Sequence, residues 1–317
     1  MKNQPIDKEI TLVSQITQKS SQTLLEFLSG KFKYLSASEW EGRIAMGKVK
    51  VNDVQASSGQ PLRAGDEVAY TTNSWEEPEV NPNYRVVFED EALLVVSKPA
   101  PLPVHAIGAY FRNTLVQLLR RDRPEARDFH LVHRLDSETS GLLLLVKDAK
   151  YLKGLQKQWS GKTVQKTYQA MVFGQFQTED LKVDAPIGKK KGSPVRMKLA
   201  VHGEEPKDSI TEFKLLERKG NFSRLQVRPL TGRTHQIRVH LEHLGFPIVG
   251  DKLYSGNDET FLHFYDNDWD DWLKERVLLP RLALHAYRLE FPHPVSGERV
   301  VLEDPLSEDL SNFWNGL

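Results

Sequence analysis

The stretch from His133 to Gly141 reads His-Arg-Leu-Asp-Ser-Glu-Thr-Ser-Gly and stands directly before an apolar run at residues 142–146. An apolar run of this kind predicts a strand that is buried on both faces. Asp136 then lies where a loop meets a rigid strand, a place where a carboxylate can serve as a base, a metal ligand or a nucleophile. The same residues also fit an aspartate that caps a turn with its hydroxyl neighbours. The chemistry of this stretch alone leaves both interpretations open.

A second polar stretch, residues 232–247, carries the signals of a helix. Thr234 is expected to be its N-cap, and Gly245 followed by a proline is expected to end it. Because the core-facing stripe falls elsewhere on the helix, Arg238 fits a solvated arginine on the helix surface. The residues of the predicted stripe are Ile237, Leu241 and Leu244.

The start of this helix is also suited to an anion. Free backbone N–H groups and the positive end of the helix dipole lie behind Arg233 and beside His235, where an RNA phosphate could bind. His235, His240 and His243 do not follow the spacing of known metal motifs, and no carboxylate pair stands near them at ligand spacing. The sequence therefore predicts no metal site here.

Tyr168 lies on a strand predicted over residues 164–173, where it shares a face with Ala170 and Val172. Tyrosines at such half-buried positions usually belong to the core, and this is the simplest interpretation of Tyr168.

Basic residues gather in one loop after residue 188. The loop lacks the spacing and the Gly-Lys-Ser/Thr ending of a loop that binds nucleotide phosphates. Its basic side chains could bind an RNA backbone. The alternative is a solvated loop without a binding role. An acidic and aromatic insertion at residues 257–276 would instead repel phosphate, so we expect it to face away from RNA or to meet another partner. The members of the basic cluster are Lys189, Lys190, Lys191, Arg196 and Lys198.

In their residues and in their order along the chain, these stretches resemble the pseudouridine synthases of the RluA family. That family carries a His-Arg-Leu-Asp-x-x-Thr-Ser-Gly motif, a Lys-x-Tyr strand and a Gly-Arg-Thr-His-Gln-Ile-Arg-Val-His stretch, and all three occur here in this order. The resemblance extends over about residues 84–304. It implies that Asp136 is the catalytic aspartate, that Tyr168 is the active-site tyrosine and that Arg238 pairs with the aspartate. Arg134 matches an arginine that helps to hold the RNA once the target base has left the stack.

The resemblance further implies an α+β fold, a mixed and mainly antiparallel central sheet with flanking helices. The irregular mixture of expected strands and helices agrees with this. The implied reaction detaches uracil from the anomeric carbon of the ribose, turns it and rejoins it through a ring carbon, so no cofactor is required. An enzyme cannot reach these atoms inside a helix, and the uridine must be flipped out or taken from an RNA loop.

Residues 84–317 are expected to form the catalytic domain, and residues 21–71 a small domain before it. The small domain resembles the α-L RNA-binding domain that precedes many RNA-modifying enzymes, although its basic residues, Lys33 among them, are few. A plain helix-plus-hairpin cap is the alternative. We interpret residues 1–20 as a tail and residues 72–83, which contain two prolines, as a linker.

The chain of 317 residues has 43 Lys and Arg against 43 Asp and Glu, so any RNA surface must come from local clustering. The absence of cysteine excludes disulfides and thiolate zinc sites. The sequence starts without a signal-peptide pattern and contains no apolar run long enough for a membrane span. We therefore expect a cytoplasmic protein without a membrane anchor, and a monomer.

Two other classes of protein deserve comparison. A glycoside hydrolase also breaks a bond at an anomeric carbon, but it needs two carboxylates, and Glu138 is the close candidate for the second. A non-catalytic RNA-binding or ribosome-assembly factor would keep the fold, but it would be expected to lose one of Asp136, Tyr168 and Arg238. Within the family, large-subunit ribosomal RNA is the expected target, and transfer RNA is the alternative because residues 104–114 look more like relatives that modify it.

Overall fold

The computed structural model of the chain describes residues 10–16, 22–32, 35–72, 77–124, 129–161 and 163–317. The chain divides into two compact units, Met1–Glu76 and Glu77–Leu317.

The larger unit begins inside the segment 72–83 that we predicted as a linker. Both carboxylate oxygens of Glu77 accept hydrogen bonds from backbone N–H groups of residues 111–113, at 2.8–3.0 Å. These bonds attach residue 77 to the body of the larger unit. Residues 73–76 of the predicted linker lie outside the described residues.

The smaller unit is a four-stranded antiparallel sheet, in the order β1-β4-β2-β3, with two helices. Each helix begins with a capping box, at Thr23 and at Ser36, in which side chain and backbone satisfy each other's free groups. Trp40 is fully buried in its core. The elements are β1 (Ile10–Gln15), α1 (Leu24–Lys31), α2 (Ala37–Ala45), β2 (Val49–Val51), β3 (Val54–Gln55) and β4 (Glu67–Thr72).

Strand β1 falls within the segment 1–20 that we predicted to be a tail, so that prediction was wrong for these six residues. The strand pairs with β4 from Ile10↔Thr72 to Gln15↔Glu67. Its structure depends on a partner far along the chain, which a local pattern does not reveal. Residues 1–9 and 17–21, and Lys33 of the small unit, lie outside the described residues.

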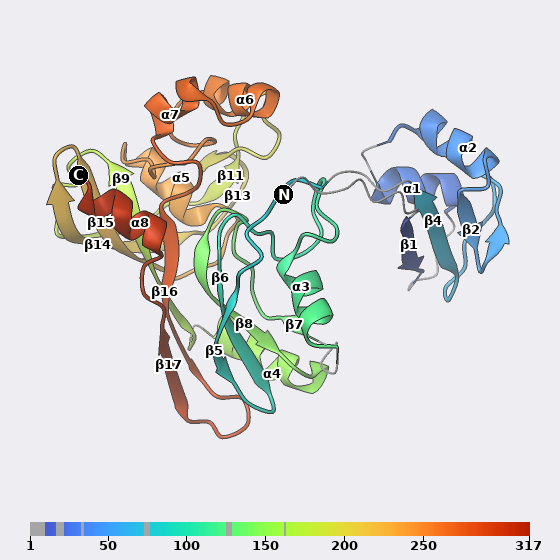
Figure 1. The fold of residues 1–317 in the computed structure, drawn as a ribbon, viewed down its shortest axis with the longest axis horizontal. Helices are drawn as coiled ribbons and strands as arrows, with labels where there is room; N and C mark the ends of the chain where they lie inside the picture. The colour runs from blue at the N-terminus through green and yellow to red at the C-terminus, as the bar shows by residue number, and fades with distance from the viewer. Residues whose placement is uncertain (1–9, 17–21, 33–34, 73–76, 125–128, 162) are drawn as a thin grey trace. The chain divides into compact units, whose positions relative to one another are not determined.

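The larger unit is built on one long sheet with helices packed around it (Figure 1). Its elements are β5 (Arg85–Glu89), β6 (Leu93–Lys98), α3 (Leu115–Asp122), β7 (His130–Leu131), β8 (Ser140–Val146), α4 (Ala149–Ser160), β9 (Gln165–Phe173), β10 (Asp180–Asp184), β11 (Ile187–Lys189), β12 (Leu199–Val201), β13 (Glu204–Lys207), β14 (Ile210–Lys219), β15 (Phe222–Pro229), α5 (Gln236–His243), α6 (Asp258–Asn267), α7 (Asp271–Val277), β16 (Leu284–Pro292), β17 (Arg299–Glu303) and α8 (Glu308–Asn315).

The strands of the long sheet follow the order β10-β14-β15-β9-β16-β8-β6-β5, with β17 beside β16 and β7 beside β8. The pair β16 and β8 is parallel, and the other pairs of the sheet are antiparallel. This is the mixed, mainly antiparallel α+β sheet that we predicted. A separate small sheet, β12-β11-β13, lies near α5 (Figure 1).

Strand β8 has the two-sided burial that its apolar run predicted. All seven residues are buried, and alternate side chains enter different cores. Leu143 and Leu145 pack in the main core, whereas Leu142, Leu144 and Val146 pack in a second core with β6 and α4. Because both faces are covered, β8 is a rigid support for the loop that precedes it.

Helix α5 differs from its prediction in two ways. It begins at Gln236, after His235 in the left-handed conformation (φ 54°) without a side-chain capping bond, so Thr234 is not the N-cap. Residues from Gln236 to Leu241 are all buried, and Arg238 is only 9% exposed. The interpretation of Arg238 as a solvated arginine was wrong because the helix packs against β12, β14 and β15 at once.

Gly141 explains why the motif after Asp136 ends in glycine. Its φ is +109°, and a Cβ there would lie 2.4 Å from the carbonyl oxygen and 2.6 Å from the nitrogen of Ala286, its partner in the parallel pair. We expect Gly141→Ala to lower the free energy of unfolding by roughly 2–6 kcal/mol, through strain and overpacking together. Denaturant unfolding monitored by circular dichroism measures this change.

The matched control is Gly154→Ala in the middle of α4, where a Cβ meets no atom within 4 Å. This change should raise stability by about 0.5–1 kcal/mol, because alanine is the better helix former. Equal effects of the two substitutions would contradict the close contact of β8 with β16.

Candidate functional site

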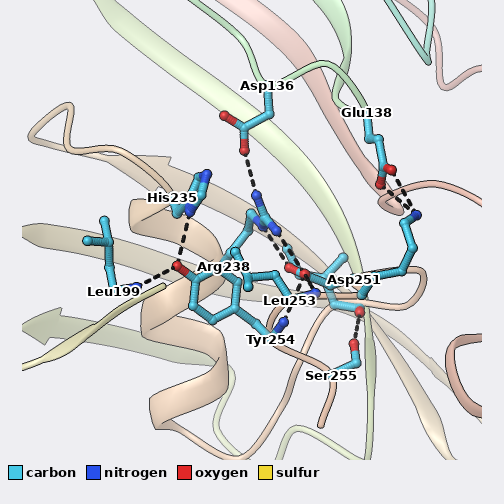
Figure 2. Close-up of polar contacts among 11 residues, drawn as sticks. Asp136, Glu138, Leu199, His235, Arg238, Asp251, Leu253, Tyr254 and Ser255 are labelled. Atoms are coloured by element: carbon cyan, nitrogen blue, oxygen red, sulfur yellow. Dashed lines mark hydrogen bonds and ion pairs between the residues drawn. The ribbon is translucent and has the colours of Figure 1, made fainter. Parts of the chain in front are cut away.

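Arg238 lies between two carboxylates (Figure 2). Its Nε and Nη2 donate hydrogen bonds to the two oxygens of Asp251, at 2.7 and 2.9 Å, and its Nη1 donates to Oδ2 of Asp136 at 3.0 Å. One guanidinium thus joins the loop before β8 to the segment after α5.

The two carboxylates have different exposure. The side chain of Asp251 is fully buried, whereas 35% of the Asp136 side chain is exposed. Asp251 also accepts hydrogen bonds from the backbone N–H groups of Leu253 and Tyr254, at 2.9 and 3.0 Å. Within the described part of the chain, Oδ1 of Asp136 accepts no hydrogen bond. Asp251 is therefore a structural partner, and Asp136 is the carboxylate that a substrate can reach.

The charge of Asp136 is favoured by its surroundings. Burial by itself would raise the pKa of Asp136, but the Arg238 guanidinium, helped by the Lys98 ammonium, outweighs burial and holds this pKa below its ordinary value. Burial likewise opposes the charge of Arg238, but Asp251 and Asp136 together raise its pKa. At neutral pH Asp136 is therefore a carboxylate, as a nucleophile or base must be.

Tyr168 belongs to the same site. It is 8% exposed and packs in the main core with Ala170 and Val172, as its place on the strand predicted. Burial, and to a smaller extent the charge of Asp136, raise the pKa of its phenol. Tyr168 therefore lies within electrostatic range of Asp136 and is protonated at neutral pH.

His235 and Tyr254 form the wall beside Arg238 (Figure 2). Nδ1 of His235 lies 3.0 Å from the phenol oxygen of Tyr254, which also accepts a hydrogen bond from the N–H group of Leu199 at 3.1 Å. The guanidinium carbon of Arg238 lies 4.9 Å from the centre of the Tyr254 ring. Burial, followed by the charge of Arg238, lowers the pKa of His235 to about 4. At pH 7 His235 is neutral, so it can offer RNA a hydrogen bond but no charge.

Lys98 holds the loop that carries Asp136. It is fully buried, and its Nζ donates to three backbone carbonyl oxygens at 2.8–3.0 Å, including that of Ser137. Burial, together with the charge of Arg281, lowers its pKa to about 7. The hydrogen bond to Ser137 thus holds the loop in place one residue after Asp136.

Glu138, the second carboxylate that a hydrolase would need, is already engaged. Its Oε1 and Oε2 lie 2.8 and 3.0 Å from Nζ of Lys252. Nζ of Lys252 also donates to the carbonyl oxygen of Pro280 at 2.8 Å. Figure 2 shows Glu138 apart from the contact between Asp136 and Arg238.

Most of the residues that we predicted to contact RNA are on the surface. Arg134 and Arg233 are exposed, with Arg134 3.3 Å from Nε2 of His105 and Arg233 donating to the carbonyl oxygen of Asp208. His235 is half-buried in the site. In the basic cluster, the exposed residues are Lys189, Lys191 and Arg196, and Lys190 is half-buried.

Lys198 does not belong with the exposed members of the basic cluster. Its side chain is fully buried, and its Nζ lies 2.8 Å from Oδ1 of Asp258, which begins α6. Asp258 also accepts a hydrogen bond from Ser193. The start of the acidic insertion thus fastens the base of the basic loop.

The sequence interpretation assigned no role to three residues of this site, Asp251, Tyr254 and Lys98. Asp251 and Lys98 lie within residues 84–304, over which the sequence resembles the family, and the Gly-Asp pair that starts at Gly250 was the available signal. Its partner was not evident because Arg238 was interpreted from helical periodicity, which says nothing about contacts between segments.

Two absences hold for the described residues. They contain no group of three or more His, Asp or Glu side chains arranged to hold a metal ion. None of their helices combines the length and the apolar character that crossing a bilayer demands.

The buried pair of Arg238 and Asp251 generates a prediction about stability. We expect Asp251→Asn to lower the free energy of unfolding by about 3–5 kcal/mol, because it leaves a buried guanidinium without its main counter-charge. Urea unfolding followed by tryptophan fluorescence provides the measurement. The control Asp180→Asn, at an exposed position of β10, should change stability by no more than about 0.5 kcal/mol. A wild-type stability for Asp251→Asn would contradict the assignment.

Known proteins are similar to this chain over nearly its whole length. The RNA pseudouridylate synthase family profile matches residues 92–243. "Ribosomal large subunit pseudouridine synthase C" of Pasteurella multocida is 33% identical, over 98% of this chain and 95% of that protein. The protein of the same name from Escherichia coli K12 is 35% identical, over 95% of this chain and 94% of its own length.

A solved structure agrees with this. "Human RNA Pseudouridylate Synthase Domain Containing 1" superposes with a TM-score of 0.57 and 28% identity, over 73% of this chain and 86% of that one. The resemblance noted in the sequence is thus confirmed, and the chain belongs to the RNA pseudouridylate synthase family, whose members are RNA-modifying isomerases.

Proposed function

We propose that this enzyme converts uridines of large-subunit ribosomal RNA to pseudouridine, with Asp136 as its catalytic residue. The observation that carries the proposal is the geometry of Asp136, whose Oδ2 accepts a hydrogen bond from Arg238 while 35% of the side chain stays exposed. The printed names of the similar bacterial proteins support ribosomal RNA over transfer RNA.

The site's residues suit the reaction. The glycosidic bond of a uridine breaks, the uracil turns, and a bond forms from the anomeric carbon to a ring carbon. That carbon loses its hydrogen to solvent, and the released ring nitrogen takes up a proton. Asp136 can attack the anomeric carbon or the ring, or take a proton from the sugar, and each route requires the charged form that Arg238 stabilises. The ring of Tyr168 can form a wall for uracil, and its phenol can take part in a late proton transfer.

The contacts of Glu138 disfavour hydrolysis as a rival reaction. A glycosidase needs a second carboxyl group that is free to donate a proton or to activate water. Both oxygens of Glu138 instead contact Lys252.

The surface residues complete the proposal. Arg134, two positions before Asp136, would hold the strand from which the uridine is flipped. Arg233 and the cluster Lys189–Lys191 would bind backbone phosphates, and His235 would add a neutral hydrogen bond. We assign the same partner, RNA, to the small N-terminal unit, whose α-L character stays a prediction. One chain supplies Asp136, Tyr168 and Arg238, which supports a monomer, and a ribosomal target supports a cytoplasmic location.

The proposal predicts how two carboxylate substitutions differ. With RNA carrying tritium on the receiving carbon of uracil, wild-type protein should release tritium from protein-free large-subunit ribosomal RNA of cells that lack the gene. Asp136→Asn should reduce release by on the order of 10⁴-fold or more, because the nucleophile or base is gone. Glu138→Gln, the control two residues away, should keep most of the activity.

Transfer RNA from the same cells is the second substrate of this experiment. Tritium release from transfer RNA alone would overturn the ribosomal target while leaving the enzyme class intact. Equal loss of activity in both variants would argue for a mechanism with two carboxylates.

Arg238 sets the pH dependence of the reaction. Because it holds the pKa of Asp136 below the ordinary value, Asp136 stays charged into the acidic range. Arg238→Lys keeps a positive charge but loses the fork that serves both aspartates, so burial should raise the pKa of Asp136. The acid limb of the kcat/KM profile should therefore move to higher pH. An unmoved limb in folded variant protein would show that Arg238 does not control the charge of Asp136.

A further inference from the structure

A cavity of about 160 Å³ lies beside the site, and the functions assigned above do not involve it. Its walls come from the end of α4 (Trp159), the start of β9 (Lys166), the end of β15 (Arg228) and the turn that leads to α5 (Thr231 and Gly232). At about 30 Å³ for each molecule of liquid water, it has room for roughly five waters or a compact group such as a phosphate, but not for a nucleotide chain.

The side chain of Lys166 gives this cavity its charge. Its Nζ lies 5.0 Å from the centre of the Trp159 ring and 3.8 Å from the place that a Cβ on Gly232 would occupy. The described residues place no carboxylate in ion-pair contact with it, and burial lowers its pKa to about 8. An ammonium that is partly removed from water and has no counter-charge is unfavourable, and an anion in the cavity would relieve this cost.

Arg228 provides a second positive charge. Its guanidinium makes two long contacts, 3.4 Å from Oε1 of Gln165 and 3.5 Å from Oε2 of Glu212, and its side chain is 41% exposed. Loose contacts of this kind leave the guanidinium able to turn toward an anion. With Lys166 and Arg228 against the half-exposed Glu212, the cavity is positive overall.

The cavity borders both segments that carry the site. Lys166 and Tyr168 stand two residues apart on β9 and share a face, which separates them by about 7 Å along the strand. The ring of His133 stacks on Trp159 with centroids 4.5 Å apart, and His133 directly precedes Arg134. Gly232 directly precedes Arg233. An RNA whose uridine rests on Tyr168 would carry a neighbouring phosphate past this opening.

We propose that this cavity is a subsite for a backbone phosphate of the RNA beside the target uridine, with Lys166 as its main cation and Arg228 as the second. The proposal rests on the proposed function, because it specifies how the same RNA is held. A phosphate fits better than a base, since Trp159 already contacts His133 and Lys166.

Salt dependence of RNA binding tests the proposal on the full chain. The probe is fluorescent, in-vitro transcribed large-subunit ribosomal RNA, and affinity is measured over a range of salt concentrations. Lys166→Met should make the slope of log K against log salt concentration shallower by about 0.7–0.9, the contribution of one phosphate contact. Lys166→Arg should keep the wild-type slope. Lys274→Met, at an exposed position of α7, is the control and should leave the slope unchanged.

An unchanged slope for folded Lys166→Met overturns the subsite, and so does a loss of affinity that is equal at every salt concentration. If Lys166→Met does not fold, Arg228→Gln carries the same expectation of a shallower slope. Tritium release by the wild-type protein is measured in parallel. If the wild-type protein releases tritium and the slope for Lys166→Met is unchanged, the subsite alone is refuted. If the slope is shallower and the wild-type protein releases no tritium, the subsite is supported and the proposed reaction is refuted.

Discussion

The interaction on which the site depends is the buried guanidinium of Arg238 between Asp251 and Asp136. Asp251 accepts hydrogen bonds from Nε and Nη2 of Arg238, so Nη1 is the nitrogen that points at Asp136. If Asp251 were absent, a free guanidinium would be expected to pair with both oxygens of Asp136, as arginine and carboxylate prefer. The buried carboxylate of Asp251 thus orients Arg238, and Arg238 keeps Asp136 charged while one oxygen of Asp136 stays free of hydrogen bonds from the described residues.

Much of the remaining architecture keeps this arrangement rigid. Strand β8 is covered on both faces, Lys98 fastens the loop before it through the carbonyl of Ser137, and Gly141 allows β8 to approach β16. On the other side, α5 is buried through its first six residues and carries Arg238 inward. A site held from both sides in this way is preorganised for charge that develops during a reaction.

The sequence predicted the elements that depend on local patterns. Strand β8 was found from an apolar run, and Asp136 was found from the polar residues that stand directly before the strand. Arg238 shows where such reasoning ends. Its partner Asp251 lies beyond a helix end and a turn, and burial of α5 on several sides comes from β12, β14 and β15, which are distant in the chain. Only the resemblance to a family indicated the pair with Asp136.

Some other ion pairs of the structure also join residues that are far apart in the sequence, and the sequence did not predict them. The balanced net charge hid the fact that acidic and basic segments meet, since Lys198 of the basic loop pairs with Asp258 at the start of the acidic insertion. Lys189 and Lys191 of the same loop stay exposed, and Lys166 lies half-buried two residues before Tyr168. Because the chain as a whole carries no net charge, attraction for RNA has to come from local groups of basic residues such as these.

The most direct test of the central claim is the kinetics of Asp251→Asn at a temperature where the variant is folded. If Asp251 positions Arg238 so that Asp136 keeps one free oxygen, kcat for pseudouridine formation falls while KM for the RNA stays close to the wild-type value. A wild-type kcat in folded Asp251→Asn, or a change confined to KM, would contradict the account.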